Sequence, residues 1–299
     1  MSATASASVP GIAIRNCTPV IGAEIAGIDL SQPLDRARLS IIEDTLHARG
    51  IVFFRRQTLS ETQQIAFSRN FGELEIHVLK QFTNPQYPEI LVLSNILENG
   101  VQKGLADAGQ RWHSDAGYRA QPDRASVLYA KEVPLPHANG ETAGDTMFAH
   151  AQAAYDALDA ATKKRLEGLR VLYSYTRAYD RKRDENGKRP AMSEEQRRGI
   201  PDVIHPLVRT HPYTGRKCIY ANPAHTVEIV GMPARESEEL LGYLYAQVTR
   251  PELIYRHQWQ VGDVLMWDNA VVWHNAVGDY ALPQRRLMHA TRIKGSVPF

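Results

Sequence analysis

Short apolar runs separated by turn residues are the feature of this 299-residue chain that most restricts its fold. They occur at 51–55, 88–95 and 125–133, and again near the end of the chain at 257–277 and 285–293. Runs of this length with β-branched and aromatic residues predict strands. They do not alternate regularly with helices, which disfavours a doubly wound parallel sheet. We therefore expect a mainly β protein with flanking helices (α+β), built as a sandwich or barrel.

The flanking helices are predicted by apolar residues at helical spacing and by helix-capping residues. Gly50 is a suitable C-terminal cap for the first helix, and Ser60 an N-cap for the second, which closes at Gly72. The helical segments are 34–50, 59–72, 149–169 (one helix or a pair) and 237–250. Short strands around a glycine turn are expected over 10–30, and a hairpin over 204–222 with its turn at 213–215.

One domain covering 1–299 is expected, because we find no internal repeat and no low-complexity linker. The chain is 43% hydrophobic, enough for one sizeable core. The charged segment 177–189 predicts a solvated loop, and the surrounding 175–202 predicts a lid over a binding site.

Charge and cysteine content exclude several classes of function. Lys+Arg 35 against Asp+Glu 33 leaves a net charge of +2, without a basic block, so no nucleic acid partner is expected. Two cysteines cannot form a disulfide framework, which favours a reducing compartment. The polar start lacks the apolar core of a signal peptide, and no run reaches membrane-spanning length. We expect a cytoplasmic protein without a membrane partner.

His113 and Asp115 stand two positions apart in "RWHSDAGY", so on a strand both side chains point to one side. Alone, such a pair more often caps, pairs or faces solvent than binds a metal. His274, at the end of the apolar segment "VLMWDNAVVWHNAV", adds a second imidazole. Two histidines and one carboxylate are the ligand set of non-haem Fe(II) oxygenases, which leaves positions open for co-substrate and O2.

Arg286 follows His274 on the next apolar strand. An arginine on the inner wall of a barrel is costly unless a carboxylate meets it, because its charge cannot be removed by deprotonation. A dicarboxylate co-substrate that chelates the metal at one end would satisfy this guanidinium at the other. The hydroxyl of Thr146, in "AGDT", could share that carboxylate. A surface ion pair is the competing interpretation of Arg286 taken alone.

Together these blocks resemble the family of Fe(II)- and 2-oxoglutarate-dependent dioxygenases typified by taurine dioxygenase and 2,4-dichlorophenoxyacetate dioxygenase. The resemblance covers nearly the whole chain and is specific, because many blocks occur in order. They are "IGAEIAGIDLSQPL", "FGELEIH", "WHSD", "GDT", "HPLVRTHPYTGR", "WDN" and "PQRRLMH".

The resemblance implies a double-stranded β-helix, the cupin-like jelly roll, and assigns roles to five residues. Iron would be held by His113, Asp115 and His274, and 2-oxoglutarate by Arg286 and Thr146. The implied reaction hydroxylates a substrate C–H bond with O2, releases succinate and CO2, and leaves a product that breaks down when the carbon carries a heteroatom.

The substrate implied by the resemblance is a small organic anion: a sulfonate, an alkyl sulfate or an aryloxyalkanoate. His77 matches a histidine that contacts the anionic group in taurine dioxygenase. The second arginine of that enzyme is replaced by Ala290, which counts against taurine, and Arg292 on the same strand face is expected to bind the head group instead. The remaining expected substrate contacts are Tyr118, Tyr220 and Asn222; Tyr175 and His225 lie in segments that usually line the pocket.

Alternatives stay open at this point. They are a non-catalytic jelly-roll protein that binds a ligand, a hydroxylase of an amino-acid-like substrate, and a zinc hydrolase using the same three ligands, in which Arg286 would have no role. A homo-oligomer, dimer or tetramer, is also expected.

Overall fold

The computed structural model describes residues 9–106, 109–186 and 191–299. The polar start examined above, up to residue 8, and four residues of the expected lid, 187–190, lie outside the described residues. Among the described helices, none has the length and apolar character needed to span a bilayer.

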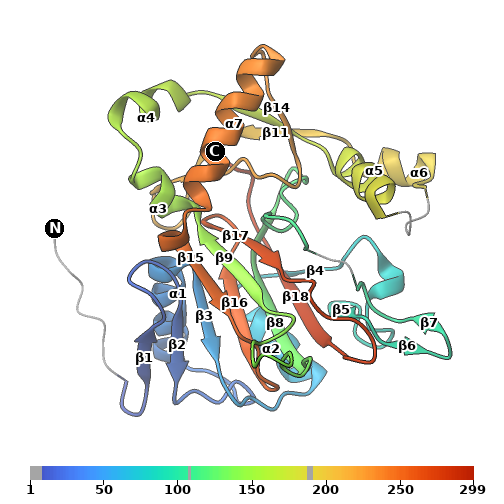
Figure 1. Ribbon diagram of the computed structural model, residues 1–299. Coiled ribbons are helices and arrows are strands. Elements are labelled where there is room, and N and C mark those ends of the chain that lie inside the picture. Colours follow the sequence, from blue (N-terminus) through green and yellow to red (C-terminus); the bar gives the residue numbers. More distant parts are fainter. Residues whose placement is uncertain (1–8, 107–108, 187–190) are drawn as a thin grey trace.

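A large sheet forms the centre of the molecule (Figure 1). Its strands are β1 (Ala13–Asn16), β2 (Ala23–Ala26), β3 (Ile51–Phe54), β4 (Leu74–Glu75), β5 (Leu91–Ser94), β8 (Asp123–Glu132), β16 (Val264–Asp268) and β18 (Leu287–Lys294). Their order is β1-β2-β3-β16-β8-β18-β4, with β5 also paired to β18. Apart from the parallel pair β2–β3, the pairs are antiparallel. Strands distant in sequence, such as β3, β8 and β16, are therefore neighbours.

A second sheet has the order β15-β9-β17. It consists of β9 (Thr146–His150), β15 (Ile254–His257) and β17 (Val272–Ala276), all antiparallel. The chain passes from β15 to β16, then to β17, then to β18, and so changes sheet at each step. The step from β16 to β17 takes only residues 269–271, and that short turn connects the two sheets.

Smaller sheets and several helices surround these two sheets. The smaller strands are β6 (Leu97–Glu98), β7 (Val101–Gln102), β10 (Arg170–Tyr173), β11 (Val203–Pro206), β12 (Val208–Thr210), β13 (Lys217–Ile219) and β14 (Thr226–Ile229). The helices are α1 (Arg36–Arg49), α2 (Glu61–Arg69), α3 (Ala151–Asp156), α4 (Ala160–Leu166), α5 (Tyr175–Asn186), α6 (Glu194–Gly199) and α7 (Ala234–Val248). A mainly β fold with several helices is thereby confirmed.

Helix boundaries follow the capping residues closely. Asp35 caps α1, which ends at Gly50 with a left-handed φ of 72°. Ser60 caps α2 and forms a capping box with Gln63. The predicted end of α2 at Gly72 is late, because the helix stops at Arg69 and a turn follows.

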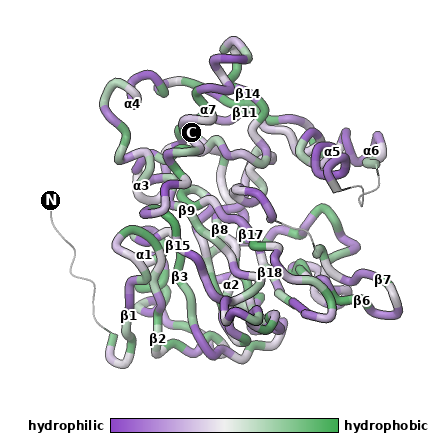
Figure 2. The backbone as a smooth tube through the Cα atoms, in the orientation of Figure 1, coloured by the Kyte–Doolittle hydropathy of each residue, from purple (hydrophilic) through white to green (hydrophobic). Residues whose placement is uncertain are grey.

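The interpretation of the charged segment as a loop is wrong over 177–186, because these residues belong to α5, a helix of 12 residues, while 187–189 lie outside the described residues. Ion pairs stabilise this helix. Asp180 pairs with Arg183 one turn on, and accepts from both terminal nitrogens of Arg197 in α6 at 2.9 and 2.8 Å. Figure 2 shows α5 and α6 as largely hydrophilic. Charge density alone is therefore a poor predictor of a loop here.

The core lies on both sides of the large sheet. In β3, Val52 and Phe54 pack on the cluster that includes residues of α1 and α2. Ile51 and Phe53 point the other way and pack on a cluster that includes Phe148 of the second sheet. Burial on both faces explains why this strand is a continuous apolar run rather than an alternating one. The cluster that includes Phe148 also contains Leu128 and Trp267, which line the cavity described next.

Candidate metal and co-substrate site

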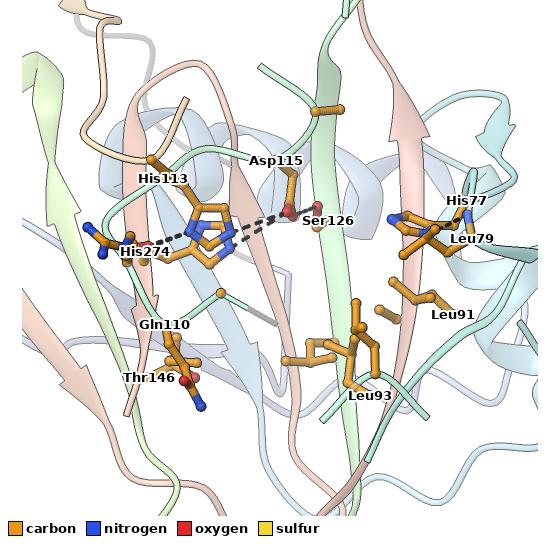
Figure 3. A pocket seen from close by; sticks show the side chains of 18 of the residues that line it. His77, Leu79, Leu91, Leu93, Gln110, His113, Asp115, Ser126, Thr146 and His274 are labelled. Atoms are coloured by element: carbon orange, nitrogen blue, oxygen red, sulfur yellow. Dashed lines mark hydrogen bonds and ion pairs between the residues drawn. The ribbon is translucent and has the colours of Figure 1, made fainter. Parts of the chain in front are cut away.

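A cavity of about 200 Å³ opens beside the two sheets. It brings together most of the side chains that the sequence singled out, from segments more than two hundred residues apart (Figure 3). The predicted site residues that line it are His77, His113, Asp115, Tyr118, Thr146, His274, Arg286 and Arg292.

His113 and His274 are held together by their main chains. They form an isolated β-bridge, with His113 N donating to His274 O at 3.1 Å and His274 N donating to His113 O at 2.7 Å. Their rings lie 4.0 Å apart between centroids. The Nδ1 of His113 faces two acceptors, the carbonyls of Arg111 at 2.7 Å and of His274 at 3.0 Å. Nδ1 must therefore carry the proton, which leaves the lone pair on Nε2.

Asp115 completes the cluster (Figure 3). Its Oδ1 lies 3.7 Å from Nε2 of His113 and 3.8 Å from Nε2 of His274, too far for hydrogen bonds. Three potential ligand atoms thus lie within 4.8 Å of one another around a common point. Two imidazole nitrogens and one carboxylate oxygen suit Fe(II), so the donor set fits the ion that the sequence suggested.

The protonation states favour a cation at this point. Burial lowers the pKa of His113 and lowers that of His274 strongly, so both rings are neutral near neutral pH. Burial alone would raise the pKa of the Asp115 carboxyl, but Arg292, His274 and His113 outweigh it and hold that pKa below its ordinary value. The cluster is therefore two neutral bases and one carboxylate.

Arg286 is a buried guanidinium on the same cavity, 6% exposed. Among the residues that the structure describes, no carboxylate lies within ion-pair distance of it, and its Nε has no hydrogen-bond partner. Thr146, also on the cavity wall, accepts from Nε1 of Trp259 at 3.0 Å. A buried charge without a counter-ion requires one, and an anionic ligand would supply it.

Arg292 also lines the cavity and contacts two carboxylates. It donates to Oδ1 of Asp115 at 3.2 Å, and its NH1 lies 3.6 Å from Oδ2 of Asp123. Both neighbours raise the pKa of Arg292, while burial raises the pKa of Asp123 to about 7. Strand alternation in the sequence identified Arg292 as a candidate. It could not predict the ion pairs of this arginine with two carboxylates.

Aromatic rings form another part of the wall. Tyr118 packs on Tyr175 at 4.5 Å and on His225 at 5.0 Å, between ring centroids. His77 lines the cavity with its Nδ1 accepting from the backbone N–H of Leu79 at 3.1 Å. Burial, with Arg292 and Arg119, lowers the pKa of His77 to about 3, so this side chain is a neutral donor rather than a cation.

Tyr220 and Asn222 do not belong to the cavity lining, which corrects the expectation that they contact substrate. Both are fully buried behind it. Tyr220 packs on Tyr173 and beneath the guanidinium of Arg209, while Asn222 accepts from the backbone N–H of His225. The segment was identified correctly, but its side chains point into the core rather than into the cavity.

Two residues beside the metal cluster were missed from the sequence. Ser126 donates to Oδ2 of Asp115 at 2.6 Å, and Asn269 accepts from the Asp115 backbone N–H at 3.0 Å. The signal for Asn269 was its place in the "WDN" block. A serine inside an apolar strand, as in 125–133, was the signal for Ser126.

A second cluster of potential ligands contains His47, His211 and Asp268. Here the Nδ1 of His211 accepts from the backbone N–H of Thr214 at 3.0 Å, so its proton is on Nε2 and is donated to Asp268 at 2.9 Å. A metal at Nε2 would have to displace that proton. The geometry therefore favours a structural, hydrogen-bonding role for His211 over metal binding.

A β-rich fold with a two-histidine, one-carboxylate cluster facing a cavity is the arrangement of non-haem iron oxygenases. Residues 13–292 match the model of the "Taurine catabolism dioxygenase TauD, TfdA family". The chain belongs to this family. The predicted class of enzyme, a 2-oxoglutarate-dependent dioxygenase that uses Fe(II) and O2, is thereby confirmed.

Relatives support the same class over almost the full length. The chain is 36% identical to an alpha-ketoglutarate-dependent 2,4-dichlorophenoxyacetate dioxygenase of Cupriavidus pinatubonensis, over 93% of this chain and 96% of the relative. It is 32% identical to an alkylsulfatase of Acinetobacter baylyi, over 95% and 85% of the two chains.

Solved structures match as well. A crystal structure of AAD-2 in complex with Mn(II) and N-oxalylglycine superposes with a TM-score of 0.79 at 31% identity, over 96% of this chain and 98% of that one. A taurine dioxygenase from Burkholderia xenovorans gives a TM-score of 0.79 at 32% identity, over 97% and 91%.

Proposed function

We propose that this enzyme hydroxylates a small organic anion with an apolar body, with His113, Asp115 and His274 holding the iron. Arg286 and Thr146 would bind 2-oxoglutarate. The observation that carries the assignment is that the Arg286 guanidinium, which has no carboxylate within ion-pair distance among the described residues, lines the same cavity as the three-residue cluster. When bound, the ion supplies the oxidation: one atom of O2 goes to succinate as CO2 leaves, and the other enters the substrate C–H bond.

The chain's own residues bind and orient the reactants. His113 and His274 present neutral nitrogens because burial keeps them unprotonated. Arg286 offers a charged fork for a carboxylate in a site where water is largely excluded, which strengthens the interaction. Leucines and the ring of Trp267 on the same wall help to exclude water from the reacting atoms.

The substrate class is inferred from the rest of the lining. Arg292 is a buried cation whose remaining N–H groups can meet an anionic head group, with His77 and Tyr118 as further donors. Leu79, Leu105 and the rings around Tyr118 offer apolar surface for the body of the molecule. Relatives named for dichlorophenoxyacetate, alkyl sulfate and sulfonate act on molecules of this kind.

We also infer that the two sheets form a double-stranded β-helix and that residues 1–299 make one catalytic domain. Alternation of successive strands between the two sheets from β15 to β18 supports the jelly-roll assignment.

The test is succinate release and O2 uptake with Fe(II) and 2-oxoglutarate across phenoxyalkanoates, alkyl sulfates, sulfonates and amino acids. Stimulation by one class of organic anion is expected. Stimulation by amino acids alone would favour the amino-acid alternative, and ligand binding without turnover would favour a non-catalytic protein.

The Arg292→Gln variant tests the head-group assignment. We expect the substrate KM to rise at least tenfold, because a charged hydrogen bond is lost, with a smaller change in the KM for 2-oxoglutarate. Glutamine keeps part of the volume and a donor toward Asp123, so the fold is preserved. An unchanged substrate KM would contradict the assignment.

A further inference from the structure

Asn269 makes a hydrogen-bonded ring with Ser126 and Asp115. Its Oδ1 accepts from the backbone N–H of Asp115 at 3.0 Å and from Nε1 of Trp267 at 2.9 Å. Two donors on one side fix the orientation of the amide, so Nδ2 points the other way and donates to Oγ of Ser126 at 3.0 Å. Asn269 and Ser126 are each 1% exposed.

The ring has a defined direction. Because Oγ of Ser126 receives an N–H from Asn269, its own hydrogen is available to Oδ2 of Asp115, 2.6 Å away. Oδ2 is thus engaged by a hydroxyl, whereas Oδ1, which also accepts from Arg292 at 3.2 Å, is the oxygen that faces the imidazoles of His113 and His274 (Figure 3). The carboxylate cannot rotate without breaking a short, buried hydrogen bond.

The strand pairing explains why the ring forms. Ser126 of β8 lies opposite Trp267 of β16, and Asn269 follows that strand at the turn leading to β17 and His274. One short segment thus carries a histidine of the cluster and the amide that orients the carboxylate.

We propose that Ser126 and Asn269 are positioning residues that present Oδ1 of Asp115, and not Oδ2, to the metal. This rests on the proposed iron site. The groups that orient a metal ligand typically affect metal affinity by 10- to 100-fold. With only one oxygen presented, the carboxylate occupies a single coordination position and leaves the others for co-substrate and O2.

The experiment measures Co(II) binding to the metal-free full-length protein by calorimetry, so the readout does not depend on turnover. Ser126→Ala and Asn269→Ala are each expected to raise the Kd at least tenfold. Ser126→Thr keeps the hydroxyl and has room toward the cavity that Ser126 borders, so its Kd should stay within about threefold of wild type. The double variant should lose less than the product of the two single losses, because both act through one ring.

Ser68→Ala is the matched control. Ser68 is a fully buried serine that bonds to Gln64 and Thr291 away from the cavity, so its loss tests the cost of removing any buried hydroxyl. Its Kd should equal that of wild type. Circular dichroism melts check folding, and if Asn269→Ala does not fold, the contrast between alanine and threonine at position 126 decides alone.

The outcomes separate the two claims. Wild-type Kd values in Ser126→Ala and Asn269→Ala would overturn the positioning role while leaving the metal site in place. Loss of binding in Ser126→Thr equal to that in Ser126→Ala would also overturn it. Failure of the wild type to bind Co(II), or binding by His113→Ala as tight as wild type, would overturn the iron site itself.

Discussion

Gly144 lies directly against the side chain of Arg286. Its φ is 69°, and a Cβ built on it would lie 3.2 Å from Cδ and 3.3 Å from Nε of that arginine. The position therefore needs glycine both for its backbone conformation and for the space it leaves. The role of this glycine of the "GDT" block is to leave space for the Arg286 side chain.

Gly144→Ala is expected to raise the KM for 2-oxoglutarate several-fold, because the guanidinium must shift by a few tenths of an ångström. Gly140→Ala is the matched control, with a φ of 83° and nothing within 4 Å of its Cβ. Both variants should lose similar stability from the left-handed backbone, but only the first should change the KM. Equal KM values in the two variants would show that contact with Arg286 is unimportant.

At the residue scale, residue spacing and the cost of burying a charge predicted several of the side chains that line the cavity. The spacing of His113 and Asp115, and a costly arginine at 286, pointed to groups that now line one cavity. The partners of Arg292 could not be predicted, because Asp123 reaches it from β8 and Asp115 from the turn after His113. Hydrogen-bond direction around Asn269 depends on three-dimensional neighbours and has no signature in composition.

At the scale of elements, α5 covers part of the cavity and is fastened at two places. Glu185 accepts from Arg111, near the metal cluster, at 2.5 and 2.6 Å. Arg181 donates to the carbonyl of Ala224 at 2.7 Å. Tyr175 and Ala178 of the same helix line the cavity, so the expected lid corresponds to α5 as a proposal.

Glu185→Gln should loosen α5 without unfolding it. We expect faster hydrogen exchange of the α5 amides and a substrate KM raised by no more than about fivefold, because exposed ion pairs contribute little. Glu239→Gln, which removes an exposed pair with Arg235 on α7, serves as the control and should leave both quantities unchanged. Exchange in α5 equal to that of wild type would contradict the fastening.

The sequence predicted α1 and α2 well because their capping residues act locally. It failed for α5, whose stabilising partners include Arg111 and Arg197, outside the helix. Interactions across long sequence separations do not appear in local periodicity. The same limitation explains why the sheet order, with β3 beside β16, became known only from the structure.

For the whole molecule, buried neutral histidines make stability depend on pH. Burial lowers the pKa of His150 to about 4, with help from Arg216 and Arg49. The unfolded chain takes up this proton below its ordinary pKa of about 6.5, whereas the folded chain does not. The free energy of unfolding should therefore fall as pH drops from about 6.5 to about 4, by up to about 1.4 kcal/mol per pH unit for this group.

His150→Asn should reduce that slope by one proton. Asparagine keeps an acceptor for the backbone N–H of Ala153, which His150 caps at the start of α3. Urea unfolding of wild type and variant at pH 7, 6 and 5 gives the two slopes. His137→Asn, at a half-buried histidine that pairs with Asp279, controls for removal of an imidazole. Parallel slopes for all three proteins would refute the prediction.

The homo-oligomer and the cytoplasmic location stay predictions. Light scattering would test the oligomeric state.

The reciprocal backbone bonds between His113 and His274 have one more consequence. They make those two imidazoles neighbours as part of folding, so a cation need not gather them from a loose chain. At the proposed iron site, binding and release of the ion would then require only local changes in a folded protein. A protein built in this way can lose its ion to a chelator, or exchange it for a competitor, and be recharged without ever passing through a disordered form.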